Sequence, residues 1–555
     1  MVAVGTVIRD CVAVLLSLIV LFALRPRLKA MDLAKSSRLA AHIRQISVAV
    51  ALFWAVAWLG IAFVRLRYPY ELEWIGGAML DHTMRIVHGK PLYVAPSGGW
   101  FPYEYPPLYF QLSASMMGLL DDYSFIPMRL ISIIATIGTA LFAAIWTREV
   151  IVSNQPGASL DTRKRASTWG VLAAGMFLAA YRFTGAWYDA ERLDMLFICL
   201  SMAAGYLLHR ACRTEPDPDK RVILAEAPVL AILSGLLFAC AFFTKQQAVL
   251  FVIAGIAAMC WLRRYSLAGV FFASWLVPCI AGITSLDRET KGWFTYYCFK
   301  VPLGNGIKPH LAAQFLFLDL PLFAPAIALT IVAFAAISER KAQAPGVSVA
   351  NREASTSIAV FAAMAAAALF GSLLSRAHWG GAENVLIPAY LFIAMSASIA
   401  SGYWALKFEK ESAAWTLLLV LAQLVVVAYR PDLQIPKPAN YAAGTSYVQL
   451  LNRLQRRGNV LSMDHGGVTL IPHFQVMAML DVIGKEKKTP QTFLDALQRH
   501  RYSCIVVDTK PKAEGLMAQI LAEYPNVERI GIKKSWVVTG FPTPAADRDV
   551  YVLRP

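Results

Sequence analysis

The sequence has 555 residues, of which 57% are hydrophobic and 16% are charged, and its formal net charge is +16. The apolar residues form long runs, which is typical of a polytopic membrane protein and argues against a soluble globular domain. The basic residues lie between these runs instead of in one patch, so the positive charge does not indicate nucleic-acid binding.

Twelve apolar runs are long enough, or nearly so, to cross a hydrocarbon core of ~30 Å. The first run has no cleavage site before Arg25, so we expect it to be retained as a span. The predicted spans are 8–24, 46–64, 126–147, 167–184, 194–209, 222–243, 247–262, 266–284, 311–336, 357–374, 386–402 and 413–429.

Lys and Arg are concentrated in loops that fall on one side of this scheme, beginning with 25–45 and 148–166. The positive-inside rule places these loops in the cytoplasm, and therefore loop 65–125 and everything after residue 430 outside. Within that external loop, the apolar run 107–120 is too short to cross, so we predict an interfacial or re-entrant helix.

The composition changes after residue 430. A Pro-rich linker, IPKPAN, precedes predicted helices at 445–457, 492–500 and 515–524 and predicted strands at 459–463, 504–508 and 550–553. This alternation predicts a small soluble α/β domain on the outer face. We therefore divide the chain into a membrane domain, 1–430, and an extracytoplasmic domain, 431–555.

Two carboxylates in the external loop, Glu71 and Glu73, follow Pro69 where a helix is expected to begin. They are either first-turn residues that favour the helix dipole, or one of them is a general base whose proton affinity is raised beside the membrane. Side chains two residues apart on a helix diverge by ~200°, so one is expected to face a cavity while the other holds the loop.

The segment YEYPPLY opens the apolar run of the external loop, with Pro107 expected at the first helical position. Its aromatic residues are also typical of the aromatic belt that membrane proteins have at the level of the lipid headgroups. Glu104 and Tyr105 are candidate substrate-binding residues.

Polar residues also interrupt two later span boundaries. Arg192 and Asp194 precede one span, and Lys245 and Gln246 separate two others. These residues either pair, snorkel or mark the membrane boundary, or they form a binding site. In that site Arg192 and Lys245 would bind an anionic phosphate, and Asp194 and Gln246 would bind the substrate. The Gln side chain beside Lys245 favours a binding site.

A third polar segment, SRAHWGGAENVLIP, is predicted on the same outer side. Turn formation alone explains its glycines and Asn. As a wall of the same site, it offers Arg376 as a further phosphate-binding cation and His378 and Asn384 as substrate-binding residues; Trp379 and Glu383 lie beside them. All of these segments are predicted on the same outer side of the membrane, and this shared location is the main evidence for one site.

The order of motifs resembles polytopic bacterial glycosyltransferases of the C superfamily, which have the GT-C fold and use lipid-linked sugars. The motifs are YELEW, HGKPLY, YEYPPLY, Arg192-Leu193-Asp194 and TKQQ, and the resemblance covers about residues 46–400. It implies that Glu71 or Glu73 is the catalytic base and that Arg192 and Lys245 face the lipid phosphate. This chain has Glu at both positions of the acidic pair, where relatives commonly have an Asp in or beside it.

These observations predict an inverting glycosyltransferase in the bacterial cytoplasmic membrane that moves a sugar from a polyprenyl-phosphate donor to a glycan, lipid or protein acceptor outside. No cofactor is required, no metal ligand set is evident, and a divalent metal is compatible with three nearby carboxylates. The alternatives are a transporter or lipid flippase, for which repeated halves are expected but not evident, and a scaffold of envelope assembly.

Overall fold

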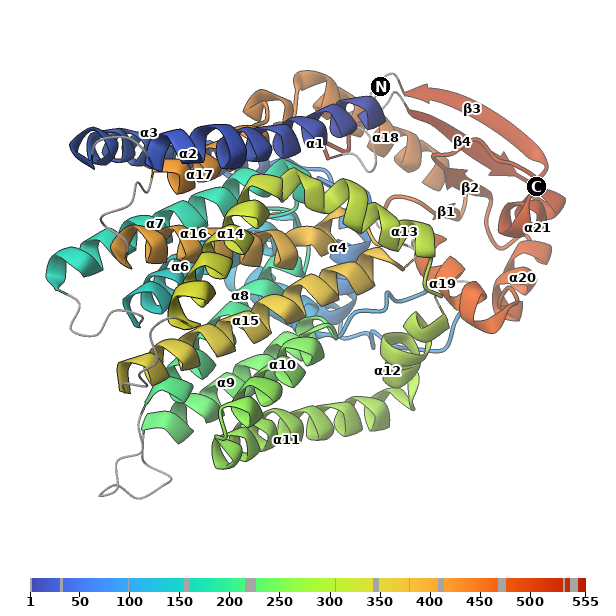
Figure 1. Ribbon diagram of the computed structural model, residues 1–555. Coiled ribbons are helices and arrows are strands. Elements are labelled where there is room, and N and C mark those ends of the chain that lie inside the picture. Colours follow the sequence, from blue (N-terminus) through green and yellow to red (C-terminus); the bar gives the residue numbers. More distant parts are fainter. Residues whose placement is uncertain are drawn as a thin grey trace.

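The computed structural model describes residues 2–29, 33–97, 99–153, 159–214, 226–304, 306–342, 349–378, 380–407, 414–467, 476–532, 535–539 and 548–555. Long helices form a bundle, and a small sheet lies at one end of it (Figure 1). The fold is therefore mainly helical, with one α/β region, as the sequence predicts.

The bundle is built around α16, which has 94% of its most apolar stretch buried inside the protein. The long helices are α1 (Val2–Leu18), α3 (Leu33–Leu66), α6 (Ile126–Ser153), α7 (Leu160–Ala179), α8 (Asp194–Arg213), α9 (Glu226–Thr244), α10 (Ala248–Trp261), α11 (Tyr265–Thr290), α14 (Ala324–Ala342), α15 (Val349–Arg376), α16 (Ile387–Lys407) and α17 (Ala414–Val426). The shorter α-helices are α2 (Arg25–Lys29), α4 (Gly76–Val87), α5 (Leu108–Leu120), α12 (Trp293–Thr295) and α13 (Pro309–Gln314). Short π or 3-10 segments cover Ile19–Leu24, Ala180–Thr184, Tyr296–Lys300, Pro302–Gly304, Phe315–Asp319, Leu320–Phe323, Glu383–Leu386 and Pro431–Leu433.

Ten stretches of the described chain are long and apolar enough to cross a membrane, which makes this a polytopic membrane protein. Two of the twelve predicted spans fall on helices outside this set. The helix α10 has only 14 residues, and α7 carries four charged residues near its start, Asp161, Arg163, Lys164 and Arg165. The number twelve stays a prediction, as does the start of one span at 222, which lies outside the described residues.

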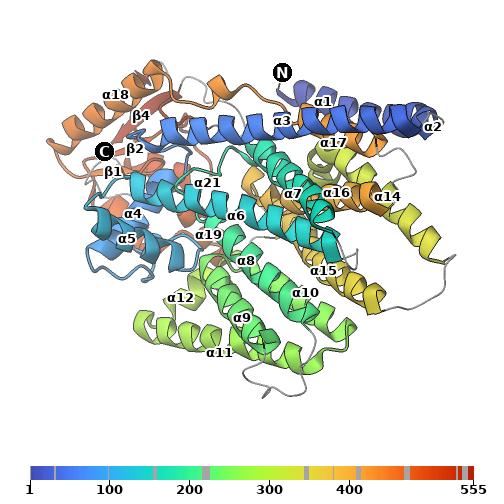
Figure 2. The same ribbon diagram turned by 90° about the vertical axis from the view of Figure 1, so that its left-hand side faces the viewer.

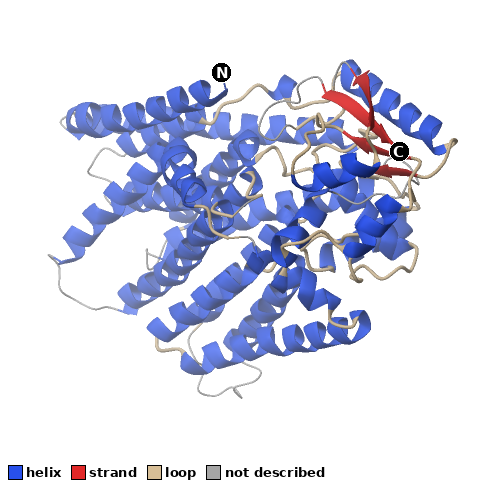
Figure 3. Cartoon of the chain, turned by 90° about the vertical axis from the view of Figure 1, so that its right-hand side faces the viewer, coloured by secondary structure: helices blue, strands red, loops and turns tan. Residues whose placement is uncertain are grey.

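The C-terminal region contains a four-stranded sheet in the order β1-β2-β4-β3 (Figure 3). The strands β1 and β2 are parallel, whereas β4 is antiparallel to both of its neighbours. Its elements are α18 (Pro438–Gln455), β1 (Val460–Ser462), α19 (Val476–Glu486), α20 (Gln491–Gln498), β2 (Cys504–Val507), α21 (Gly515–Glu523), β3 (Asn526–Ile532) and β4 (Arg548–Arg554). The three helices and three strands predicted here are present, whereas α19 and β3 were not predicted.

The two faces of this sheet belong to different hydrophobic cores. On one face, Val506 and Val552 pack with Tyr447 and Leu451 of α18. The other face contributes to a core that also contains residues of the external loop. The members of that shared core include Met79, Leu80, Phe101, Phe110, Leu461, Met479, Phe493 and Ile505. Figure 2 accordingly shows α4 and α5 at the end of the molecule that carries the sheet.

Candidate active site

The turn between α3 and α4 carries both predicted acidic residues. We predicted a helix directly after Pro69, and this is wrong: residues 67–75 form turns and bends, and α4 begins only at Gly76. Arg129 of α6 explains the difference, because its guanidinium donates to the carbonyl oxygens of Tyr68 and Tyr70 at 2.5 and 2.6 Å. These carbonyls are bound to Arg129 instead of to a helical amide.

Glu191 completes this clamp from the segment before α8. One carboxylate oxygen accepts a hydrogen bond from the Leu72 amide at 2.8 Å, and the other contacts Nε of Arg129 at 2.6 Å. Both side chains of the ion pair are fully buried. Neither residue was predicted to belong to the site, although an Arg so close to the start of an apolar span is a usable signal.

Glu73 faces into the protein from this clamped turn and is only 3% exposed. Its Oε2 accepts from the Ile75 amide at 3.0 Å, while its Oε1 lies 3.3 Å from Nη1 of Arg192 and has no hydrogen-bond partner among the described residues. Burial raises the pKa of Glu73 to about 7 against the opposing effect of the Arg192 charge. This carboxylate therefore has one oxygen that is ion-paired but not hydrogen-bonded, and its pKa lies near neutral pH.

Glu71 has a different environment and is fully buried. Its Oε1 contacts Nδ1 of His465 and accepts from Nε1 of Trp536 at 3.1 Å, and its Oε2 accepts from the Gly77 amide at 3.0 Å. Both oxygens are thus occupied by the protein. Glu71 therefore contacts the C-terminal region through both His465 and Trp536.

Arg192 lies at the centre of the site and is 2% exposed. Its guanidinium stacks 4.6 Å from the centre of the Trp187 ring and donates to the Tyr105 hydroxyl at 3.2 Å. Two of its nitrogens, Nε and Nη1, have no hydrogen-bond partner among the described residues. These two nitrogens make only ion pairs, with Asp194 and Glu73. A planar cation that is held by stacking and has donors outside hydrogen bonds is suited to binding an anion.

Three of the predicted segments converge on Asp194, the first residue of α8. Lys245 contacts one of its oxygens at 2.7 Å, Asn384 donates to the same oxygen at 2.9 Å, and Arg192 lies 3.8 Å from the other. The structure therefore brings Arg192, Lys245 and Asn384 together as a cationic and polar group around a single carboxylate.

Glu104 and Gln246 lie beside this group. Gln246 donates to the carbonyl oxygens of Glu104 and Cys298 at 2.6 and 2.8 Å, which fixes the loop against the membrane helices. The Oε1 of Glu104 is buried without a hydrogen-bond partner among the described residues. Burial, with the charge of Asp481 adding to it, raises the pKa of Glu104 to about 9, so its carboxyl group is protonated at neutral pH. Pro107 is at the N-cap of α5, one residue before the predicted position.

Two of the predicted site residues, Arg376 and His378, contact residues outside the polar group around Asp194. Arg376 pairs with Asp319 at 2.9 Å and donates to the Gly381 carbonyl at 2.7 Å. His378 forms an isolated backbone bridge with Ile307, and Trp379 lies outside the described residues. The proposed roles of Arg376 and His378 stay predictions.

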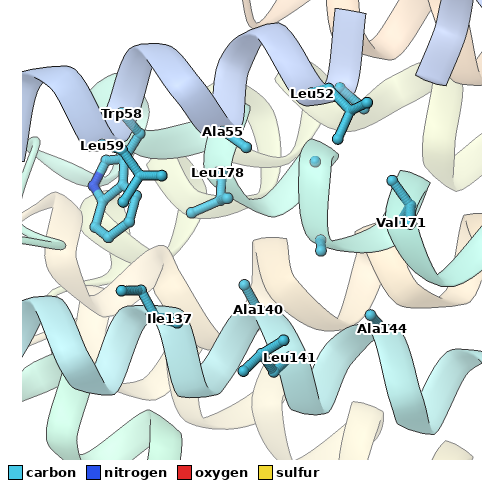
Figure 4. Close-up of a pocket in the computed structure, with 13 residues that line it drawn as sticks. Leu52, Ala55, Trp58, Leu59, Ile137, Ala140, Leu141, Ala144, Val171 and Leu178 are labelled. Carbon is cyan, nitrogen blue, oxygen red and sulfur yellow. The ribbon is translucent and has the colours of Figure 1, made fainter. Parts of the chain in front are cut away.

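The described residues contain no group of three or more His, Cys, Asp or Glu side chains arranged to hold a metal ion. An apolar groove of about 320 Å³ lies elsewhere, between α3, α6 and α7 (Figure 4). Leu52, Trp58, Ile137 and Leu141 are among the residues that line it, and none of the polar residues described above is.

No family model and no curated protein matches the sequence. Solved structures do match. ArnT from Cupriavidus metallidurans bound to undecaprenyl phosphate superimposes with a TM-score of 0.53 at 11% identity, over 90% of this chain and 97% of that chain. The archaeal oligosaccharyltransferase AglB from Archaeoglobus fulgidus, in complex with an inhibitory peptide and a dolichol-phosphate, gives 0.48 at 12% identity, over 83% and 69%.

The chain has the GT-C fold. The match extends over nearly the whole length of ArnT, so the resemblance predicted from five short motifs is confirmed as a resemblance of fold. At 11% identity the likeness concerns the arrangement of the helices and not the residues of the site. In this chain, that GT-C arrangement places Glu73, Arg192 and Asp194 close together.

Proposed function

We propose that this protein is a membrane glycosyltransferase that transfers a sugar from a polyprenyl-phosphate donor to an envelope glycan, lipid or protein, with Glu73 as general base. The fold supports this proposal, since the ArnT structure that it resembles was solved with undecaprenyl phosphate bound. The single observation that carries it is the buried Oε1 of Glu73, which is ion-paired with Arg192 but makes no hydrogen bond with the described residues.

The chemistry follows from the environment of Glu73. The acceptor hydroxyl oxygen attacks the anomeric carbon while Glu73 takes its proton, and the bond from that carbon to the phosphate oxygen breaks with its electron pair. A single displacement inverts the anomeric carbon. A base with a pKa of about 7 balances basicity against the fraction that is deprotonated at neutral pH.

Arg192 and Lys245 are the proposed partners of the leaving phosphate. In the structure both side chains are ion-paired with Asp194. A bound phosphate would accept hydrogen bonds from the same nitrogen donors that now contact this carboxylate. Cations already in place where negative charge develops stabilise the transition state without reorganisation. Phosphate is a good leaving group, and this mechanism needs no strong general acid.

Glu104 and Tyr105 are proposed to contact the substrate beside this centre. Because the carboxyl group of Glu104 is protonated at neutral pH, it can donate a hydrogen bond to a sugar hydroxyl. Gln246 and Asn384 are proposed to position the same ligands through the contacts described above. A divalent metal would need ligands from the substrate, because the described residues supply no set of three.

We place the site on the outer face of the bacterial inner membrane. The helices α7 and α15 begin at the end of the bundle that is far from the sheet (Figure 1), and the start of α7 is basic. Basic ends remain in the cytoplasm, which leaves the sheet and the site outside. A polyprenyl tail keeps its sugar at this headgroup level.

The test is transfer of labelled sugar from a pool of polyprenyl-phosphate-linked sugars, in membranes that contain matched amounts of wild type or Glu73→Gln. We expect the variant to lose ~10²- to 10⁴-fold in transfer rate. Glu528→Gln, which removes a carboxylate from an exposed ion pair with Arg554, is the matched control and should keep full activity. If wild-type membranes consume no lipid-linked sugar, the proposal fails, and a lipid flippase becomes the better hypothesis.

A further inference from the structure

The contact between Glu71 and His465 joins two parts of the chain that are 394 residues apart. His465 follows β1, is 2% exposed, and contacts Asp508 at the end of β2 through its other ring nitrogen, at 3.1 Å. The ring also lies edge-on to Trp536, with 4.6 Å between the ring centres. A carboxylate of the catalytic loop is therefore connected to two adjacent strands of the sheet.

The charges in this chain of contacts are complementary. Burial alone would lower the pKa of His465, but the carboxylates of Glu71 and Asp508 outweigh it and raise the pKa to about 10. The imidazole is therefore protonated at neutral pH, and both ring nitrogens donate hydrogen bonds. Asp464 and Tyr447 are the other titratable groups nearby, and Asp464 accepts from the Asp508 amide at 2.9 Å.

Further contacts hold the residues on both sides of Glu73. The Leu72 carbonyl accepts from the amides of Val538 and Thr539 at 3.2 and 2.8 Å. After Glu73, a Cβ added to Gly77 would meet the Gly466 carbonyl at 2.3 Å, so the two backbones are in close contact there. The C-terminal region therefore fixes the turn before and after the proposed base.

We propose that His465 is a positioning residue: it holds Glu71, and through the short turn from Glu71 to Gly77 it holds Glu73 in the geometry that transfer requires. This inference rests on the proposed function for its effect on catalysis. It makes the C-terminal region an integral part of the catalytic centre. His465 itself contacts no reacting atom.

Two substitutions of His465 separate this role from simple packing. His465→Asn removes the ring but can place its amide nitrogen near the position of Nδ1, so the donor to Glu71 is kept. His465→Gln removes the same ring but places its amide near Nε2, so the donor to Glu71 is lost and the one to Asp508 is kept. The two variants thus differ mainly in the contact that the proposal concerns.

Hydrogen exchange of the amides in 71–77 and steady-state transfer would be measured on both full-length variants in the same lipid nanodiscs. We expect His465→Gln to lower kcat by ~10- to 100-fold through misplacement of the base, with KM for the lipid donor changed by less than about twofold. The exchange of 71–77 should be faster, whereas His465→Asn should stay closer to wild type in both measurements. Glu71→Gln combined with His465→Gln should add less than about twofold to the loss in kcat.

Equal behaviour of the Asn and Gln variants, or unchanged exchange and kcat in His465→Gln, would overturn the inference. If His465→Gln does not accumulate as folded protein, Glu71→Leu takes its place because it removes the same contact from the other side, and wild-type exchange in that variant would equally overturn the inference. The exchange measurement requires no transfer. Absence of transfer by the wild type would therefore defeat the proposed function and leave the positioning role to be decided by exchange.

Discussion

Glu71 and Glu73 are two residues apart in the chain, yet their surroundings give them different chemistry. Each carboxylate is buried, and the difference lies in what surrounds its oxygens. Glu71 meets a protonated His, an indole and an amide, whereas Glu73 keeps one oxygen beside a guanidinium without a hydrogen bond. The contacts that each carboxylate makes are therefore set by its neighbours, and not by residue type.

The pH dependence of transfer tests the assignment of the base. Glu73 must be deprotonated to accept a proton, and its pKa is about 7, so kcat/KM should rise about tenfold per pH unit below 7 and level off above it. Above pH 9, ionisation of Glu104 should reduce activity if its proton binds the substrate. Rates measured from pH 5 to 10 on the same membranes check both limbs, and a flat profile between pH 5 and 8 contradicts the assignment.

At the scale of elements, the turn before α4 depends on an ion pair from two other segments. Arg129 of α6 and Glu191 before α8 bind the backbone of residues 65–72, so the turn cannot continue as a helix. Their full burial makes the pair sensitive to loss of either charge.

Glu191→Gln should therefore destabilise the protein by ~3–5 kcal/mol, because the guanidinium of Arg129 is left buried without a counter-charge. Thermal unfolding in detergent measures this loss. Glu226→Gln breaks an exposed pair with Arg210 and should cost only ~0–1 kcal/mol. Equal unfolding temperatures for the two variants would show that the buried pair contributes little.

The start of α4 also contacts the C-terminal region closely enough to exclude a side chain. In Gly77→Ala, the new Cβ would lie 2.3 Å from the Gly466 carbonyl and 2.7 Å from Oε2 of Glu71, so one of these groups must move. We expect a cost of ~1–3 kcal/mol and faster proteolysis of the C-terminal region. Gly118→Ala in α5 has no atom within 4 Å of the added Cβ and is the control that should resist proteolysis like the wild type.

At the scale of the whole molecule, the membrane bundle and the sheet are joined by a common hydrophobic core. Met79 and Phe110 of the external loop share this core with Met479 and Ile505 of the C-terminal region. The boundary that composition predicts at residue 430 thus separates two kinds of sequence but does not separate two independent cores.

The orientation of the whole molecule is testable with fusions. An alkaline phosphatase, which is active only outside the cytoplasm, should be active when joined after Pro555, because the sheet is proposed to lie outside. The same enzyme joined after Arg213 at the basic end of α8 should be inactive. The reverse pattern of activities would place the site in the cytoplasm.

Local sequence was sufficient for ten of the twelve predicted spans and for most of the C-terminal elements, because apolar runs and their interruptions are properties of neighbouring residues. The α19 helix and the β3 strand were missed. The strand lies at the sheet edge with its first four residues exposed, so it lacks the buried alternation that marks a strand. The helix has only 11 residues, and none of the five residues before it in the sequence is a Ser, Thr, Asp or Asn that could cap it.

The sequence by itself determined a polytopic membrane protein whose polar segments interrupt apolar runs, and it identified Glu71, Glu73, Arg192, Asp194 and Lys245 as the residues to examine. Only the tertiary structure decided that both oxygens of Glu71 are hydrogen-bonded within the protein, whereas one oxygen of Glu73 makes only an ion pair with Arg192. The deciding contacts join Glu71 to His465 across 394 positions and Arg129 to Glu191 across 62. No local pattern encodes such pairs, because the environment of a buried charge is created by residues that meet only when the chain folds.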